Sequence, residues 1–402
     1  TYVDDAWVRL TREGRVAVDV RLDGPVAANQ SVTLSIPEIG VTLRGRTDEN
    51  GAWKDALAAP RRLQRWNPGS PVLYDVEVTA ADDVWKDRIG FRTIETRGAD
   101  ILLNGRPIFM SGVSLHEEEF GLNPSRAITQ AAARALLLEA RDGLNANFVR
   151  LAHYPHTEVT TRLADELGLL VWSEIPVYWR IDWSNPQTLA VARNMLAENV
   201  MRDRNRASIV IWSIANETPV SDARNRFLTT LAQDVRAMDD TRLLSAALLT
   251  KRTEEGHPVL TLDDPAAPLL DIVAINTYNG WYGADRLSDL ASIEWRLPSD
   301  KPLIFSEFGA DAKAGFHDLE GDPQKFSEEY QAEYYRQTLA MAERIPTLRG
   351  LSPWILKDFR SPRRQTVFQQ GWNRKGLVSE TGQRKLAFDV LAQFYADQDP
   401  QG

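Results

Sequence analysis

Hydrophobic positions follow two different patterns along the chain, and the change falls near residue 97. Before it, apolar and polar residues alternate in short runs such as RVAVDVRL (15–22), where Val16, Val18 and Val20 share one face. This alternation predicts half-buried antiparallel strands, and similar β-rich runs occupy 31–36, 41–47, 73–80 and 88–96. Several strands within about a hundred residues predict a small β-sandwich over residues 1–97.

From residue 98 the apolar runs are continuous, and helical stretches such as 129–143, 160–168, 194–204 and 224–238 separate most of them. The eight apolar runs are 108–116, 146–152, 169–176, 209–217, 242–248, 271–278, 302–309 and 348–356. Eight strands buried on both faces, with amphipathic connections, predict an α/β fold, the (β/α)8 TIM barrel, over residues 98–402. A doubly wound sheet is the alternative, but no glycine-rich phosphate loop follows any of these strands.

Composition removes several classes of function. The formal net charge of -9 at pH 7 argues against partners such as nucleic acid or an anionic membrane, which bind basic surfaces. No apolar run approaches the roughly 20 residues that span a bilayer. The chain contains no cysteine, which excludes disulfides, thiolate catalysis and cysteine-ligated metal. We expect no cofactor, because the glycine fingerprint of nicotinamide and flavin enzymes is missing.

Polar residues gather at the C-terminal ends of the predicted barrel strands, where TIM barrels carry their active sites. Glu217 and Glu307, which end the fourth and seventh strands, form the strongest pair. Hydrolysis of a glycosidic bond needs two carboxyl groups, one protonated and one ionised, and two adjacent carboxylates raise one pKa. For either glutamate alone, an ion pair with an arginine at the barrel mouth explains its position almost as well.

Several segments resemble glycoside hydrolase family 2, the family of β-galactosidases, β-glucuronidases and β-mannosidases. SIVIWSIANETP (208–219) and PLIFSEFGAD (302–311) look like its acid/base and nucleophile segments. NGRPIFMSGVSLHE (104–117) and RWNPGSPVLYDVEV (65–78) resemble an earlier barrel strand and its immunoglobulin-like domain, so the resemblance covers nearly the whole chain. It implies a retaining exo-β-glycosidase in which Glu217 is the general acid/base and Glu307 the nucleophile.

The remaining site predictions concern the walls of the pocket. Arg150 is expected to orient a carboxylate, and His116 to line the pocket or, with Glu117, to bind a cation. We expect Glu174 to be structural, and no metal at His153 with His156. Trp281 is expected to join Tyr282 in an aromatic wall. The predicted substrate-binding residues are Asn216, His153, Asn276, Tyr278, Tyr282, Trp354, Asn373 and Lys375.

The substrate prediction depends on the stretch WILKDFRSPRRQTVFQQGWNRKGL (354–377). It is similar to the β-glucuronidase branch, in which an Asn-x-Lys motif, here Asn373 and Lys375, binds the sugar carboxylate. We therefore favour a β-glucuronide. A β-galactosidase remains the alternative, because relatives acting on neutral sugars carry the same tripeptide. The branch has an arginine where this chain has Gln369, and nearby Arg360, Arg363 and Arg364 are candidate replacements.

Other features leave alternatives open. A non-catalytic carbohydrate-binding protein on the same fold would also bind a β-glycoside, and transglycosylation would use the same two glutamates. The chain begins at Thr1 without an initiating methionine or the family's sugar-binding jelly-roll domain, so we expect a truncated N-terminus. Cytoplasmic and periplasmic locations both stay open, as does a homo-oligomer.

Overall fold

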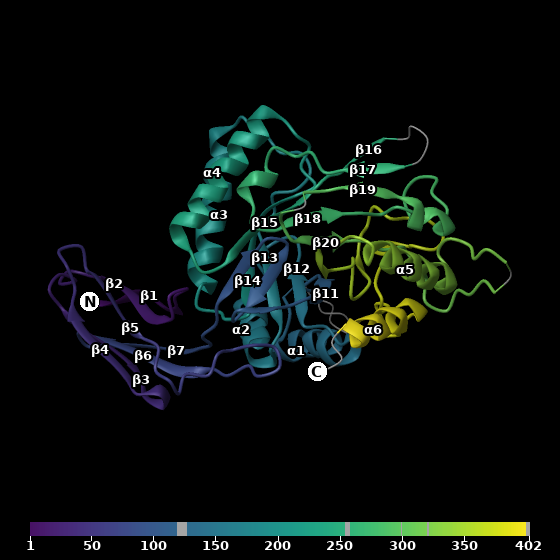
Figure 1. The fold of residues 1–402 in the computed structure, drawn as a ribbon. Helices are drawn as coiled ribbons and strands as arrows, with labels where there is room; N and C mark the ends of the chain where they lie inside the picture. Colours follow the sequence, from purple (N-terminus) through teal and green to yellow (C-terminus); the bar gives the residue numbers. More distant parts are fainter. Residues whose placement is uncertain (119–126, 254–257, 299, 320, 399–402) are drawn as a thin grey trace.

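The computed structural model describes residues 1–118, 127–253, 258–298, 300–319 and 321–398. Its N-terminal strands form a sandwich at the left of Figure 1, and the rest of the chain forms a barrel surrounded by helices. Within the described residues, no helix is both long enough and apolar enough to cross a membrane.

The sandwich consists of two antiparallel sheets, with the strand orders β1-β2-β5 and β4-β3-β6-β7. Val16, Val18 and Val20 are buried between the sheets, which is the face that the alternation predicts. The elements are β1 (Tyr2–Leu10), β2 (Arg15–Asp23), β3 (Ser31–Ile36), the 3-10 helix η1 (Pro37–Ile39), β4 (Val41–Arg46), β5 (Ala52–Ala58), β6 (Tyr74–Ala80) and β7 (Asp83–Ile89).

The prediction of one strand over residues 88–96 is wrong. β7 ends at Ile89, and β8 (Ile94–Arg97) belongs to a separate three-stranded sheet with β9 (Asp100–Leu103) and β10 (Arg106–Pro107). Between them the chain crosses to the barrel, where the buried Arg92 guanidinium donates to the carbonyls of Ala207 (3.0 Å) and Thr241 (2.9 Å). The predicted domain boundary lies in the turn between β8 and β9, and the division into 1–97 and 98–402 stays a prediction.

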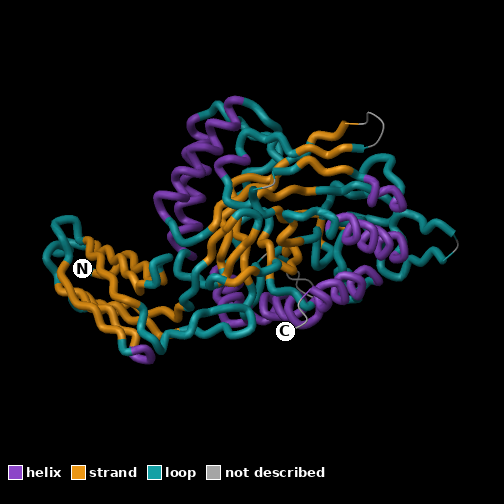
Figure 2. The backbone as a smooth tube through the Cα atoms, in the orientation of Figure 1, coloured by secondary structure: helices purple, strands orange, loops and turns teal. Residues whose placement is uncertain are grey.

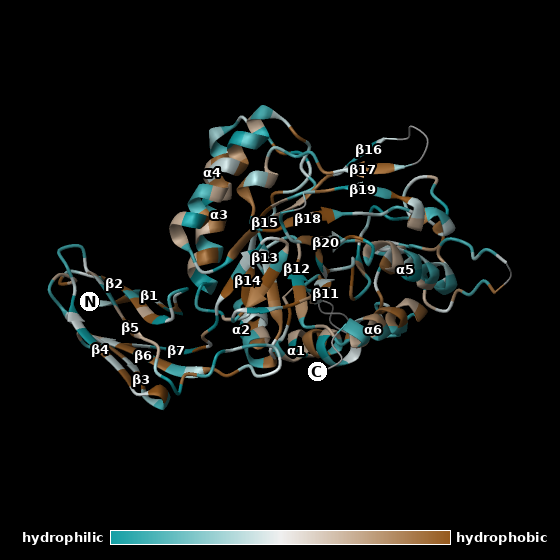
Figure 3. Ribbon diagram, in the orientation of Figure 1, coloured by the Kyte–Doolittle hydropathy of each residue, from teal (hydrophilic) through white to brown (hydrophobic). Residues whose placement is uncertain are grey.

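Eight parallel strands close the barrel, and each overlaps one predicted apolar run (Figure 2). The TIM-barrel prediction is therefore confirmed. Most barrel strands are brown in Figure 3 because nearly all of their side chains are apolar and buried. In barrel order the strands are β11 (Met110–Leu115), β12 (Phe148–Leu151), β13 (Leu170–Glu174), β14 (Ile209–Asn216), β15 (Leu243–Leu248), β18 (Val273–Asn276), β20 (Leu303–Glu307) and β21 (Leu348–Leu351).

The outer layer is helical around most of the barrel. The helices are α1 (Gln130–Leu138), the π-helical η2 (Glu139–Gly143), α2 (Glu158–Leu167), α3 (Pro186–Asp203), α4 (Asp222–Met238), the 3-10 helices η3 (Ala267–Leu269) and η4 (Leu287–Ser292), α5 (Glu328–Ala342) and α6 (Leu386–Gln398). Around β15 and β18 a small sheet replaces long helices; its strands are β16 (Lys251–Thr253), β17 (Val259–Thr261) and β19 (Glu294–Arg296). A last pair, β22 (Phe359–Arg360) and β23 (Trp372–Asn373), follows the final barrel strand.

Polar side chains join the sandwich to the base of the barrel. Asn205, just after α3, accepts from the amide of Val8 (2.9 Å) and donates to the carbonyl of Ala6 (2.7 Å). Arg206 pairs with Asp87 of the sandwich and with Asp165 of α2. These contacts hold the sandwich at the N-terminal end of the barrel strands and leave the C-terminal end open.

Candidate active site

A pocket of about 470 Å³ opens at the C-terminal end of the barrel. Because its walls come from strand ends and from the loops that follow them, residues distant in sequence meet there. The lining residues are His116, His153, Tyr178, Trp179, Asn216, Glu217, Tyr278, Tyr282, Glu307, Trp354, Phe359, Ser361, Arg364, Asn373 and Lys375.

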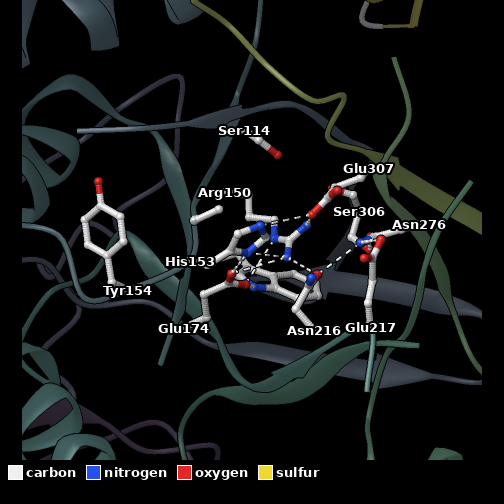
Figure 4. A network of polar contacts seen from close by, with 12 residues as sticks. Ser114, Arg150, His153, Tyr154, Glu174, Asn216, Glu217, Asn276, Ser306 and Glu307 are labelled. Carbon is white, nitrogen blue, oxygen red and sulfur yellow. Dashed lines mark hydrogen bonds and ion pairs between the residues drawn. The ribbon is translucent and has the colours of Figure 1, made fainter. Parts of the chain in front are cut away.

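Glu307, the last residue of β20, lies in this pocket beside Arg150 (Figure 4), and Tyr278 contacts it as well. Arg150 donates to its Oε1 at 2.9 Å, and the Tyr278 hydroxyl donates to its Oε2 at 2.7 Å. Burial raises the pKa of Glu307 above its ordinary value, whereas Arg150 and His153 oppose that rise and the Glu217 carboxylate adds to it. The direct contact with Arg150 stabilises the ionised form of Glu307.

Arg150 is fully buried and connects Glu307 to a second carboxylate, Glu174. Glu174 accepts from Arg150 (3.1 Å), from the Trp172 indole (2.7 Å) and is 2.6 Å from His153 Nδ1. Burial alone would raise the pKa of Glu174, but Arg150 and His153 outweigh burial and lower it to about 2. Glu174 lies behind the pocket wall, where it fixes Arg150 and His153.

Glu217 follows β14 and has a different set of neighbours. Within the described part of the chain, its carboxyl accepts from two neutral donors, the indole of Trp179 (3.0 Å) and the amide of Asn276 (2.9 Å). Asn276 also donates to Asn216 Oδ1 (3.0 Å), which accepts from Arg150 at 2.8 Å. Glu217 has φ of 50°, in the left-handed region, so its side chain leaves the direction of β14 and turns into the pocket.

A cationic wall lies in the same pocket. Lys375 Nζ is 2.6 Å from Asp311 Oδ1 and 3.0 Å from the Tyr282 hydroxyl. Gln369 donates to the other Asp311 oxygen at 2.5 Å, and Asn373 Oδ1 accepts from the Lys375 amide at 3.1 Å. Lys375 and Asp311 are both buried. Although burial raises the pKa of Tyr282, Lys375 and Arg364 outweigh it and lower that pKa below its ordinary value.

The structure brings most predicted site residues to this one pocket. His116 lines it, with its ring stacked on Phe359 at 4.5 Å. Arg150 and Asn276 lie directly behind the lining residues and contact the two glutamates. The predicted residues that line the pocket are His116, His153, Asn216, Glu217, Tyr278, Tyr282, Glu307, Trp354, Asn373 and Lys375.

Two neighbouring residues named in the sequence analysis, Trp281 and Glu117, do not line the pocket. Trp281 is buried in the barrel core against Phe326 and does not line the pocket, so the predicted aromatic wall contains Tyr282 without it. Glu117 accepts from the Thr157 amide (3.0 Å) and the Thr160 hydroxyl (2.5 Å), which fixes it at the start of α2. Among the described residues, no group of three or more potential ligands is arranged to hold a metal ion.

The sequence interpretation missed four residues that line the pocket: Tyr178, Trp179 and Ser361, which lie in loops, and Phe359, which begins β22. It also assigned no role to Asp311, although that residue stands four positions after Glu307 in the segment PLIFSEFGAD. The available signal was two adjacent aromatic residues, Tyr178 and Trp179, shortly after the third barrel strand.

The fold and the polar strand ends together define a TIM barrel with an N-terminal sandwich and a polar pocket at the C-terminal ends of its strands. Residues 94–396 match the family model "Glycosyl hydrolases family 2, TIM barrel domain", and residues 1–92 match "Glycosyl hydrolases family 2". The chain belongs to glycosyl hydrolase family 2.

Similar proteins include beta-glucuronidases from distant organisms. The chain is 27% identical to the beta-glucuronidase of Paenibacillus borealis, covering 94% of this chain and 65% of that protein. It is 28% identical to the Rattus norvegicus beta-glucuronidase, covering 98% of this chain and 61% of that protein. The chain thus spans less than two thirds of the length of these relatives.

Solved structures show the same architecture. A beta-galacturonidase from Eisenbergiella tayi, solved with bound galacturonate, superposes with a TM-score of 0.81 at 25% identity, covering 98% of this chain and 72% of that chain. The beta-D-glucuronidase of Dictyoglomus thermophilum gives a TM-score of 0.79 at 24% identity, covering 98% and 68%. The latter likeness shows the fold alone.

Proposed function

We propose that this chain carries the catalytic site of a retaining β-glycosidase that removes a terminal β-linked glucuronic acid. The observation that carries the proposal is the placement of Glu217 and Glu307 in one pocket with Lys375. Two carboxyl groups supply the chemistry of glycoside hydrolysis, and a buried lysine matches the carboxylate of a uronic acid.

The contacts of the two glutamates support different roles. Glu307 contacts the Arg150 cation, which favours the carboxylate that a nucleophile needs. Glu217 accepts from the neutral donors Trp179 and Asn276, and it lies in the segment that resembles the acid/base segment of the family. We therefore assign Glu307 as the nucleophile and Glu217 as the general acid/base.

The reaction then proceeds in two displacements. A Glu307 oxygen forms a bond to the anomeric carbon while the bond to the leaving oxygen breaks, and Glu217 gives its proton to that oxygen. In the second step Glu217 takes a proton from water, the water oxygen bonds to the anomeric carbon, and the bond to Glu307 breaks. Two inversions leave the sugar in its original β configuration.

The choice of sugar rests on the cationic wall. Lys375, Asn373 and Arg364 line the pocket together, and Asp311 balances part of this positive charge. A charge-assisted hydrogen bond from lysine is a strong contact for a carboxylate. The family relatives named beta-glucuronidase and the beta-galacturonidase structure are consistent with a uronic acid.

The test compares para-nitrophenyl β-D-glucuronide with the matching β-D-galactoside. We expect the glucuronide to be preferred, and Glu307→Ala to reduce its turnover to background. We expect Lys375→Met to lower kcat/KM on the glucuronide by about tenfold to a hundredfold, because a hydrogen bond to a charged group is lost. Lys251→Met, which removes an exposed lysine, is the matched control.

Lys375→Met alone leaves the buried Asp311 carboxylate without its lysine partner. The double variant Lys375→Met with Asp311→Asn removes both charges, so its activity reports on recognition of the sugar and not on an unpaired buried charge. If it keeps the glucuronide defect, the lysine itself recognises the sugar. A preference for the galactoside that Lys375→Met leaves unchanged would contradict the glucuronide proposal and favour the β-galactosidase alternative. Binding without turnover of either substrate would favour a carbohydrate-binding protein.

A further inference from the structure

A small cavity lies at the junction between the sandwich and the barrel, at the opposite end of the barrel from the candidate active site. Its volume is about 20 Å³, which is enough for one water molecule or one monatomic ion but not for a phosphate or a sugar. Four arginines line it, and none of the described lining residues is an aspartate or a glutamate. The lining residues are Val8, Arg9, Leu10, Gly90, Arg92, Arg204, Asn205, Ala207, Thr241 and Arg242.

Two of these arginines carry buried N–H groups that find no acceptor in the described part of the chain. Arg204 is 8% exposed, and its Nε makes no such hydrogen bond, although its terminal nitrogens contact Asp5 and the Met238 carbonyl. Nε and one terminal nitrogen of Arg9 are in the same situation, and the ion pair of Arg9 with Asp19 is long, at 3.4 Å. A buried donor without an acceptor destabilises a fold, so these groups favour an acceptor inside the cavity.

Arg9 and Arg204 also lie against the same aromatic ring, that of Trp7. Their guanidinium carbons are 3.6 Å and 4.7 Å from the centroid of the ring. The ring stabilises each cation, but it also keeps two like charges close together, and like charges repel strongly where little water screens them. A negative charge in the cavity would offset this repulsion.

Arg92 and Arg242 add two more buried guanidinium groups to the lining. Arg92 donates to three backbone carbonyls and pairs with no carboxylate among the described residues. Burial and the neighbouring charge of Arg242 lower the pKa of Arg92 to about 9, although Asp239, which pairs with Arg242 at 2.9 Å, opposes the change. The chain therefore balances only part of the positive charge around the cavity.

We infer that this cavity binds a small monatomic anion, of which chloride is the most available. An anion accepts hydrogen bonds from several N–H groups at once and supplies the negative charge that the lining lacks. A water molecule fits the same volume but carries no charge. Because the lining comes from β1, from the segment between β7 and β8 and from the barrel, the bound anion contacts both parts of the chain and stabilises their junction. The site is independent of the proposed function.

The experiment locates the anion first and then measures its effect on stability. Crystals of the unaltered chain soaked in sodium bromide should show an anomalous peak for bromide in this cavity. The melting temperature is then measured in increasing sodium chloride, with sodium isethionate, whose anion is too large for the cavity, keeping the ionic strength constant. We expect it to rise by about 1–3 °C for each tenfold increase in chloride above the dissociation constant, because the anion binds only the folded chain.

Arg9→Met removes the unpartnered N–H groups of Arg9 and should abolish both the bromide peak and the response to chloride. Asp19 keeps a cationic partner in this variant, because Lys54 lies 3.1 Å from it. Arg12→Met is the matched control, since Arg12 is exposed just after β1 and does not line the cavity, and it should keep both signals.

A water molecule in the cavity without an anomalous peak would overturn the inference. Equal melting temperatures in chloride and isethionate, or a response to chloride that survives Arg9→Met, would overturn it as well. If Arg9→Met does not fold, the bromide peak and the chloride response of the unaltered chain decide the question by themselves.

Discussion

Buried charges at the C-terminal end of the barrel carry a desolvation cost, and their contacts explain how they are tolerated. Arg150 and Glu174 are almost completely buried, yet each side-chain nitrogen of Arg150 and each carboxyl oxygen of Glu174 has a partner at hydrogen-bond distance. A buried ion is stable only when its partners replace the lost hydration. The same partners fix the side chains that face the substrate pocket.

Glu174 should make stability depend on pH in a defined window. Its pKa falls from 4.5 when unfolded to about 2 when folded, so it stabilises the protein above pH 4.5, and this contribution is lost as pH falls towards 2. At about 1.4 kcal/mol for each tenfold change in the ionisation constant, the whole effect is about 3 kcal/mol.

Urea unfolding at pH 5, 4 and 3 measures this dependence. The Glu174→Gln variant should lose less stability on acidification than the unaltered chain, because the other carboxyl groups titrate equally in both. If the free energy of unfolding falls equally with pH in the two proteins, the low pKa of Glu174 is contradicted. The exposed carboxyl of Glu95 provides a control through Glu95→Gln, which should leave the curve unchanged.

Among the elements, the barrel strands were the most predictable part of the fold. Their side chains are buried on both faces, so each strand appears in the sequence as a continuous apolar run that ends at a polar residue, as Glu217 and Glu307 do. The strand ends therefore indicated much of the candidate pocket. Loop residues such as Trp179 carry no such pattern, because their positions depend on contacts with the neighbouring strand.

Contacts between elements could not be predicted from the sequence, because they too depend on residues that are distant along the chain. The stretch 88–96 is rich in β-forming residues, yet it divides where Arg92 bonds carbonyls of the barrel that lie more than a hundred residues away. Asp311 likewise gains its role only when the loop after β20 meets the segment after β21. Its ion pair with Lys375 joins these two loops.

Breaking this ion pair should destabilise the protein. Asp311→Asn leaves the buried Lys375 ammonium without its carboxylate, and we expect a loss of about 3–5 kcal/mol in the free energy of unfolding. Chemical denaturation measures the loss. Asp263→Asn is the matched control, because Asp263 pairs with Lys251 on the surface, and it should cause no measurable change. Equal losses in the free energy of unfolding for Asp311→Asn and Asp263→Asn would contradict the expected contribution of the buried ion pair.

At the scale of the whole molecule, the sandwich and the barrel are joined by specific polar contacts. The Asn205 side chain satisfies both the amide of Val8 and the carbonyl of Ala6 on β1. An unsatisfied buried backbone group destabilises a fold, so these bonds couple the stability of the sandwich to that of the barrel.

Removing the Asn205 side chain should weaken this coupling. We expect Asn205→Ala to lower the free energy of unfolding by about 1–3 kcal/mol, because two buried backbone groups lose their partner. Differential scanning calorimetry should show a lower transition temperature for the sandwich. Asn194→Ala is the control, since Asn194 is exposed on α3 and contacts Glu198. A variant as stable as this control would contradict the proposed coupling.

We propose that Glu307 attacks the anomeric carbon and that Glu217 first donates a proton and then accepts one. A β-glucuronyl fluoride carrying a second fluorine beside the anomeric carbon tests it most directly, because the second fluorine slows the second displacement. Fluoride leaves as the enzyme oxygen bonds to the anomeric carbon, and peptide mass spectrometry identifies the labelled residue. The account predicts a stoichiometric label on Glu307. A label on Glu217, or turnover without any covalent intermediate, would contradict it.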